Sequence, residues 1–379
     1  MTEMETLQSE VEWTESLPST LRVEAALLFS TAQTTVKRQN ISDLLPNVDD
    51  WSWFERQTLK HGLSALVHRH LSNYNDEVPD SLLQNLEQQA RQVAFHNMRQ
   101  TQELLRVTKV LEANDIPVIP FKGPALALWG YGDVSLRTFG DLDLLVPYEL
   151  ILDARQCLEQ DLGYASHKTF VDGEAQTFVD TGMGWEFIRE RPRSVVEIHW
   201  SFFFDIYPFA LQPGEVWERH VTRIVGGQPV RSFDTTDMLL YLSYHGLKHR
   251  FGALKWVVDV REWVLSHPEI TWSVVWKRAE EARCLRAVHV ALLMADLPQG
   301  KPLPDEALRE ARSDDRAAKL VKQIVDGWLF AEPENSQTET FEDVWFHVRS
   351  CDRLVHGIPF VWHYMKLGGQ SFVQRLTGN

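Results

Sequence analysis

The hydrophobic pattern divides the chain into a helical first third, a β-rich middle and a helical last third. Apolar residues recur at helical spacing over 20–39, 49–71 and 80–114. The third run predicts one long amphipathic helix, with a break near Asn97 as the alternative. β-rich runs follow at 116–121, 142–147, 177–179, 184–188 and 195–200, with a helix over 149–162 among them. After a small strand near 221–230, helices are expected over 235–249, 254–266, 271–296, 304–330 and 339–366.

This order of elements predicts an α+β fold. Its centre would be a small mixed β-sheet, and helical regions would flank that sheet on both sides in the sequence. We expect a helical region over 1–115, a core over 116–231 that carries the chemistry, and a helical domain over 232–379.

Composition narrows the class of protein. The chain has 379 residues, of which 44% are hydrophobic and 24% charged, which is typical of a globular protein with a sizeable core. Its formal net charge of −15 disfavours broad, sequence-independent binding of nucleic acid, because such binding needs a basic face. A local basic pocket for a phosphate remains compatible with this charge.

Cysteine usage and the absence of targeting signals bear on the compartment. The three cysteines are odd in number and widely spaced, so they form neither a disulfide framework nor a metal-binding pattern. The first residues are acidic and lack the layout of a signal peptide, and no apolar run is long enough to span a bilayer. We therefore expect a cytoplasmic protein without membrane contact.

Two aspartates provide the first candidate chemistry. Asp141 and Asp143 lie two residues apart at the start of an apolar run, so in a strand both would point to the same side. Carboxylates held side by side repel each other unless a positive charge lies between them. A divalent metal ion is the usual solution, and the alternative is a pair of acids that caps a turn.

The segment upstream is suited to binding phosphate. Lys122 and Gly123 end one apolar run and begin a short helix, and backbone N–H groups at a helix start attract anions. Arg137, on the Gly-rich turn before Asp141, is a candidate phosphate clamp, and Lys122 can serve the same purpose. The alternative for Arg137 is an ion pair with Asp133 or Asp141.

A later strand offers a third carboxylate. Glu197 and His199 alternate onto one face of the run 195–200, and a carboxylate among apolar residues is costly unless it is paired or bound to metal. Three carboxylates suit Mg²⁺, or Mn²⁺, with the phosphates of a substrate. The alternative for Glu197 is a salt bridge with Arg189 or Arg193. His199 fits either a buried core histidine or a hydrogen-bond partner of a carboxylate.

Together these motifs resemble a known family. The order Lys122-Gly-x-Ala125, Tyr131-Gly-Asp-x-x-Leu-Arg137, Gly140-Asp-Leu-Asp143 and Val196-Glu-Ile-His-Trp200 is similar to that of the uncharacterised nucleotidyltransferase family, within the DNA polymerase beta-like superfamily. The resemblance runs from about Asp80 to Lys255 and includes His245-Gly-Leu-Lys-His249. The chain departs from the wider superfamily at the phosphate loop, where Gly123-Pro124 stands in place of Gly-Ser.

The resemblance implies a metal-dependent transfer of a nucleoside monophosphate from an NTP, with ATP expected, to a hydroxyl or phosphate acceptor. Asp141, Asp143 and Glu197 would be the catalytic metal ligands. The acceptor would be a small molecule or peptide, since the family is associated with gene clusters for modified peptides and surface polysaccharides. Phosphoryl transfer from the same site and a catalytically inactive scaffold remain alternatives.

The helices after residue 232 offer further polar candidates. His245 and His249 are spaced like a zinc pair, but the intervening Glu of such motifs is absent and no third ligand is evident. We place His245, Lys248 and Lys255 along a cleft wall that faces the catalytic strands, where the lysines would contact nucleotide or acceptor phosphates. The alternative is that these residues are polar groups of helix packing, held by Asp259.

Overall fold

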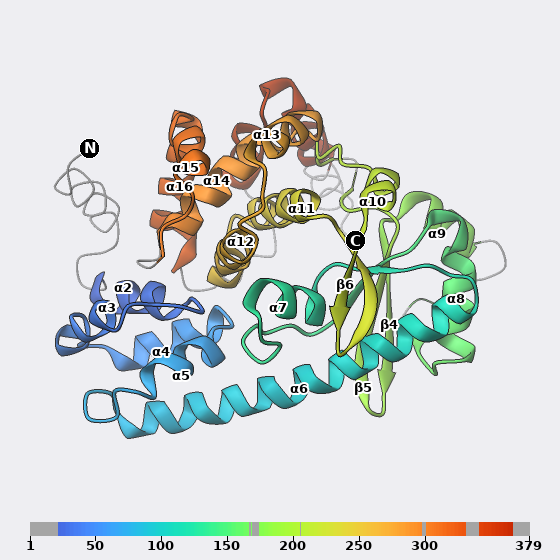
Figure 1. Ribbon diagram of the computed structural model, residues 1–379. Helices are drawn as coiled ribbons and strands as arrows, with labels where there is room; N and C mark the ends of the chain where they lie inside the picture. The colour runs from blue at the N-terminus through green and yellow to red at the C-terminus, as the bar shows by residue number, and fades with distance from the viewer. Residues whose placement is uncertain are drawn as a thin grey trace, which may run out of the picture.

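The computed structural model describes residues 22–166, 168, 174–204, 206–297, 301–330 and 341–366. A five-stranded sheet of order β1-β2-β5-β4-β3 lies in the middle of the chain, with helices before and after it (Figure 1). The expected α+β class, with a small mixed sheet flanked by helical regions, is confirmed. The boundaries expected at 115/116 and 231/232 remain a prediction.

The sheet is mixed because one of its pairings is parallel. β2 (Leu142–Leu145) pairs in parallel with β5 (Arg193–His199) and antiparallel with β1 (Ile119–Pro120). β4 (Gly184–Glu190) lies antiparallel to β5 on its other side and carries β3 (Ala165–Ser166) at the edge. β2 and β5 are therefore the central strands.

Alternation along the central strands gives the sheet two different faces. Leu142, Leu144, Val196 and Ile198 point into an apolar cluster formed with the helices α6 (Asp80–Ala113) and α8 (Ile151–Gln160). Leu145 points the other way and joins a second, larger cluster that contains α11 (Thr235–Lys248) and α12 (Leu254–Ser266). The face opposite α6 and α8 therefore meets the helices that follow the sheet.

Helix α6 runs without interruption from the N-terminal helices to the sheet (Figure 1). Its 34 residues span about 50 Å at 1.5 Å per residue. The alternative of a break near Asn97 is wrong, because the Asn97 side chain donates to the carbonyls of Val134 and Arg137, in the turn after α7, and does not compete with its own helix. The same contacts tie α6 to the Gly-rich turn.

The remaining helices surround this core. The N-terminal group is α2 (Arg22–Thr31), α3 (Arg38–Ser42), α4 (Trp51–Lys60) and α5 (Ser64–Leu71). Helix α7 (Gly123–Tyr131) packs on α12, and α10 (Pro213–Arg219) precedes a hairpin of β6 (Val221–Val225) and β7 (Gln228–Ser232). The C-terminal part contains α13 (Trp272–Glu281), α14 (Leu285–Asp296), α15 (Asp305–Arg312), α16 (Asp315–Ile324), a π-helix (Val325–Leu329) and α17 (Phe341–Ser350).

Several expected elements differ in the structure. The helix expected over 339–366 is interrupted after α17 ends at Ser350, and a 3-10 helix follows at Leu354–Gly357. The strand expected at 177–179 is part of helix α9 (Glu174–Thr181), whose Val179 is buried in the core of the sheet. The helix expected over 271–296 is divided where Arg283 takes a φ of 56°. The helix expected over 304–330 is divided where the Asp314 side chain caps α16 by accepting from two backbone N–H groups.

The strand expected near 221–230 is a two-stranded hairpin, β6–β7, with Gly226 and Gly227 at positive φ in its turn. Among the described residues, no helix has both the length and the apolar character that crossing a bilayer requires.

Candidate active site

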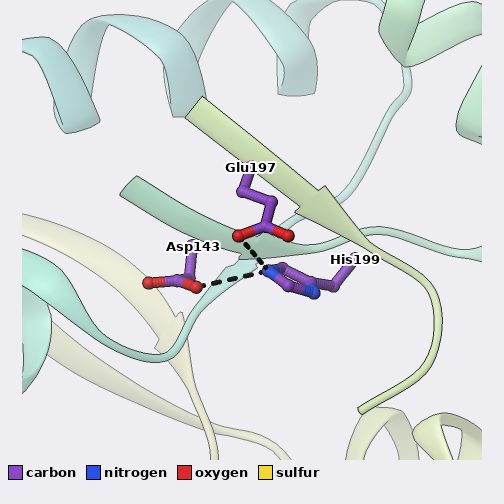
Figure 2. A group of neighbouring side chains, drawn as sticks. All are labelled: Asp143, Glu197 and His199. Carbon is purple, nitrogen blue, oxygen red and sulfur yellow. Dashed lines mark hydrogen bonds and ion pairs between the residues drawn. The ribbon is translucent and has the colours of Figure 1, made fainter. Parts of the chain in front are cut away.

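The parallel pairing of β2 and β5 creates the site. Asp143 lies opposite Glu197 in the register, and His199 lies opposite Leu145. All three polar side chains therefore emerge on the face opposite α6, from two adjacent strands. We call Asp143, Glu197 and His199 the carboxylate cluster (Figure 2).

The three side chains converge on one point. One ligand atom from each lies within 4.8 Å of the others, and Figure 2 shows one ring nitrogen of His199 facing both carboxylates. Nε2 of His199 lies 3.2 Å from Oδ1 of Asp143 and 3.4 Å from Oε2 of Glu197. His199 is thus both a buried histidine and a hydrogen-bond partner of Asp143, which unites the two interpretations of its role.

Lys122 adds a positive charge to the cluster. Its Nζ donates to Oδ1 of Asp143 at 2.9 Å and lies about 5.5 Å from the centres of the Phe121 and Tyr241 rings. Burial lowers the pKa of Lys122, but the Asp143 carboxylate and the Tyr241 hydroxyl outweigh it and raise that pKa above its ordinary value. Lys122 is therefore a fixed positive charge.

The second oxygen of Asp143 is available to a ligand. Oδ2 is buried and has no hydrogen-bond partner among the described residues. Burial raises the pKa of Asp143, but Lys122 and His199 lower it well below its usual range, so the carboxylate is ionised. An ionised buried oxygen without a partner is costly, and a bound cation or donor would remove that cost.

Glycine at position 184 keeps the cluster open. Gly184 lies opposite His199 on the neighbouring strand β4. A Cβ atom there would lie 2.9 Å from Nδ1 of His199 and 3.0 Å from Oε1 of Glu197. A side chain at this position would crowd His199 and Glu197, so this glycine is part of the site, and no local pattern in the sequence indicates it.

The backbone at the start of α7 also depends on a glycine. Gly123 has a φ of 54°, and a Cβ on it would lie 3.0 Å from the carbonyl oxygen of Asp141. This close approach brings the first turn of α7 next to the strand that carries Asp143. The expected strand–Lys122-Gly123–helix arrangement is present, and the N-terminus of the helix lies beside the cluster.

Asp141 lies outside the carboxylate cluster. It immediately precedes β2, and its carboxylate is not one of the three groups that converge within 4.8 Å. Burial, followed by the charge of Asp143, raises the pKa of Asp141, so the expected repulsion between the two aspartates is present. The role of Asp141 as a metal ligand remains a prediction.

Arg137 has a partner that the sequence did not identify. Its guanidinium donates through Nε and Nη2 to the two carboxylate oxygens of Asp259, at 2.6 and 2.9 Å, and both side chains are buried. Neither Asp133 nor Asp141 is this partner. A bidentate pair leaves Arg137 little freedom to reach a phosphate, so phosphate contact by Arg137 remains a prediction.

The alternative pairing of Glu197 with Arg189 is not what the structure shows. Arg189 pairs with Glu103 at 2.8 Å, and the nearest charged partner recorded for Glu197 is His199. The Glu197 side chain is 31% exposed, while that of Asp143 is 1% exposed. Glu197 is therefore the ligand of the cluster that solvent and substrate can reach.

The helical candidates surround the cluster. His245, Lys248 and Lys255 are partly buried on α11 and α12, and the charge of Lys122 contributes to the pKa of all three. Burial, the largest cause, lowers all three values. Their place along a cleft wall and the contact of the two lysines with phosphate remain predictions. The rings of His245 and His249 lie 4.9 Å apart, but among the described residues they belong to no three-ligand group.

The donor set could hold a divalent cation. Two carboxylates offer the oxygen ligands that Mg²⁺ and Mn²⁺ prefer, and the imidazole favours Mn²⁺ of the two. The unpaired Oδ2 of Asp143 would gain a partner from such an ion.

Comparison with known proteins agrees with this chemistry. Residues 47–299 match the family model described as uncharacterised nucleotidyltransferase. No curated protein matches the chain. The crystal structure of an antigenic nucleotidyltransferase-like protein from Paracoccidioides brasiliensis aligns with 55% of this chain and 96% of its own, at 15% identity and a TM-score of 0.33. At this identity and TM-score, the likeness says nothing about the function of the chain.

Proposed function

Because the chain belongs to the family of uncharacterised nucleotidyltransferases, we propose that it transfers a nucleoside monophosphate, AMP from ATP, to a hydroxyl or phosphate acceptor and releases pyrophosphate. The observation that carries the proposal is the buried, unpartnered Oδ2 of Asp143 beside Glu197, His199 and Lys122. These groups can hold a cation and a polyphosphate at one point.

In this proposal each residue has a separate task. Asp143 and Glu197, with Asp141 as a further candidate, would hold Mg²⁺ or Mn²⁺, which neutralises phosphate charge when bound. Lys122 and the first N–H groups of α7 attract the triphosphate. The acceptor oxygen forms a bond to the α-phosphorus while the bond to pyrophosphate breaks. Glu197 accepts the acceptor's proton, because it is ionised and is the most exposed carboxylate of the cluster.

The biological setting is also a proposal. The family resemblance supports a biosynthetic role in peptide natural products or polysaccharides, with a small molecule or peptide as the acceptor. Three buried free thiols suit a reducing compartment, so we place the reaction in the cytoplasm. The acidic balance of the chain speaks against nucleic acid as the acceptor.

Removal of the cluster's carboxylates tests the proposal. We expect Asp143→Asn and Glu197→Gln to weaken Mn²⁺-dependent ATP binding by on the order of 100-fold, since a metal ligand contributes several kcal/mol. Calorimetric titration measures the binding, and circular dichroism checks the fold. Asp153→Asn is the matched control, because Asp153 is exposed on α8, the helix that covers the other face of the sheet.

The label that reaches the product decides the reaction type. ATP labelled at the α-phosphorus should pass its label to the acceptor, whereas ATP labelled at the γ-phosphorus should not. Transfer of the γ-label would replace nucleotidyl transfer with phosphoryl transfer. If both cluster variants bind metal and nucleotide like the wild type, the catalytic assignment fails and the inactive scaffold is favoured.

A further inference from the structure

A cavity lies beside the carboxylate cluster. It has a volume of about 420 Å³, within the range of small-molecule sites. Its walls come from the end of α11, the turn into α12, the start of α12 and one face of α17. It is lined by Tyr207, Lys248, His249, Arg250, Gly252, Ala253, Trp256, Asp343 and His347.

Lys248 joins this cavity to the carboxylate cluster. Its Nζ lies over the rings of Phe203 and Tyr207, 5.2 and 5.1 Å from their centres. Burial lowers the pKa of Lys248, and the charges of Lys122 and Glu197 also act on that pKa. Phe203, which Lys248 contacts, stacks with Tyr241 at 5.9 Å, and Lys122 of the cluster lies over the ring of Tyr241. The cavity is therefore joined to the cluster through these two rings.

The lining of the cavity has an excess of positive charge. Among the described residues that line it, Asp343 is the single carboxylate, and it pairs with Arg250. Within this described lining, Lys248 has no carboxylate partner. In a chain with a net charge of −15, a basic and largely aromatic cavity is a local exception that suits an anion.

Two histidines in the lining are held neutral by their surroundings. Burial, together with the charges of Lys248 and Arg250, lowers the pKa of both His249 and His347 to about 4. Lys122 acts on His249 in the same direction, and His249 acts on His347. An anion in the cavity would oppose these charges and would favour uptake of a proton.

We propose that this cavity binds the acceptor, and that the acceptor carries an anionic group, a phosphate or carboxylate, which Lys248 holds. The proposal rests on the nucleotidyl transfer proposed above and adds the acceptor's chemical class to it. The nucleotide phosphates are placed at Lys122 and α7, so nucleotide and acceptor occupy adjacent sites and bind together.

Small aromatic anions test the cavity directly. Phenyl phosphate, benzoate and the neutral benzyl alcohol are titrated calorimetrically into the full chain, first alone and then with Mg²⁺ and a methylene analogue of ATP at saturation. We expect at least one anion to bind, benzyl alcohol not to bind, and the nucleotide not to displace the anion. Preference between the two anions identifies the acceptor's charged group.

Two variants separate the cavity from the carboxylate cluster. Lys248→Met should weaken anion binding by about tenfold or more, because it removes a charge-assisted contact. Lys277→Met, on the exposed surface of α13, is the matched control and should bind the anion like the wild type. Asp143→Asn should lose nucleotide binding and keep anion binding, so failure of either proposal can be recognised separately.

Proton uptake gives an independent measurement. With benzoate as the anion, binding enthalpies in buffers of different ionisation enthalpy should reveal net proton uptake near about pH 5, just above the pKa of the two histidines. His347→Gln should reduce that uptake while it leaves the fold intact by circular dichroism. The proposal is overturned if neither anion binds, if the nucleotide displaces the anion, or if Lys248→Met weakens nucleotide binding and leaves anion binding unchanged.

Discussion

Two buried aspartates, Asp259 and Asp143, both face a cation, yet only one of them has all its oxygens occupied. Asp259 accepts from Arg137 on both oxygens, and Oδ1 also accepts from the Tyr131 hydroxyl at 2.7 Å. At Asp143, Lys122 and His199 share Oδ1, and Oδ2 has no partner among the described residues. Both sites pair a buried aspartate with a cation, but only Asp259 has a partner on each of its oxygens.

Whether both carboxylate oxygens have partners distinguishes an ion pair that stabilises the fold from one that can bind a ligand. A carboxylate with a donor on each oxygen gains little from a further cation, so the Arg137–Asp259 pair fixes α12 against the Gly-rich turn. A carboxylate with an empty oxygen and an exposed neighbour, Glu197, gains from a ligand. The comparison therefore assigns structure to one site and binding to the other.

The largest effect is expected at the Arg137–Asp259 pair. Arg137→Met would leave the buried Asp259 charge without its partner, which costs about 3–5 kcal/mol of unfolding free energy. Urea denaturation measures this loss. Arg91→Met is the control, because Arg91 is 77% exposed on α6 and its pair with Glu87 contributes little.

The opposite result would make Arg137 a nucleotide-binding residue. If Arg137→Met keeps the wild-type stability and instead weakens ATP binding, the guanidinium exchanges Asp259 for phosphate when nucleotide binds. That outcome would support the phosphate clamp expected from the sequence and would break the distinction between the two sites.

Local patterns were sufficient to predict the central part of the site. Period-two alternation placed Glu197 and His199 on one face, and the same rule directed Asp143 away from Leu142 and Leu144. The position of Lys122-Gly123 before a helix followed from the apolar run that ends there. These inferences needed only neighbours in the sequence, and the structure brings Lys122, Asp143, Glu197 and His199 together.

Long-range partners were beyond the reach of the same reasoning. Arg137 and Asp259 are 122 positions apart, and nothing local to either residue identifies the other. Gly184 matters because the register of β4 against β5 places it opposite His199. The strand expected at 177–179 failed for a related reason, since three residues are too few to reveal the helical period that runs over Glu174–Thr181.

Lys122 provides the next test, because it is the internal cation of the open site. Lys122→Met should increase the affinity of the nucleotide-free protein for Mn²⁺ by about tenfold. Two unit charges 4 Å apart interact by about 4 kcal/mol at an effective dielectric constant of about 20. The expected gain is a fraction of this repulsion between the lysine and the metal ion. Electron paramagnetic resonance of free Mn²⁺ measures the affinity.

The same variant should bind ATP more weakly, since a phosphate contact is lost. Lys322→Met, an exposed lysine on α16, serves as the control and should change neither affinity. Weaker Mn²⁺ binding in Lys122→Met would mean that the lysine organises the carboxylates and does not compete with the metal ion for them.

The smallest effect is expected from the protonation of His199. Burial lowers its pKa, but hydrogen bonds and charges from Asp143 and Glu197 outweigh burial and raise it above the ordinary value. A group whose pKa is raised by folding stabilises the fold fully below its unfolded pKa of about 6.5, and this contribution is lost as the pH rises through the folded pKa.

In EDTA, the melting temperature of the wild type should therefore exceed that of His199→Gln most at about pH 5.5, and the gap should narrow towards about pH 8.5. Mn²⁺ affinity should change in the opposite direction, because the neutral ring offers a lone pair and no longer repels the ion. A gap that widens with pH would mean that His199 is neutral in the folded protein. The open site would then bind cations equally well across this range, and its metal affinity would be set by the carboxylates alone.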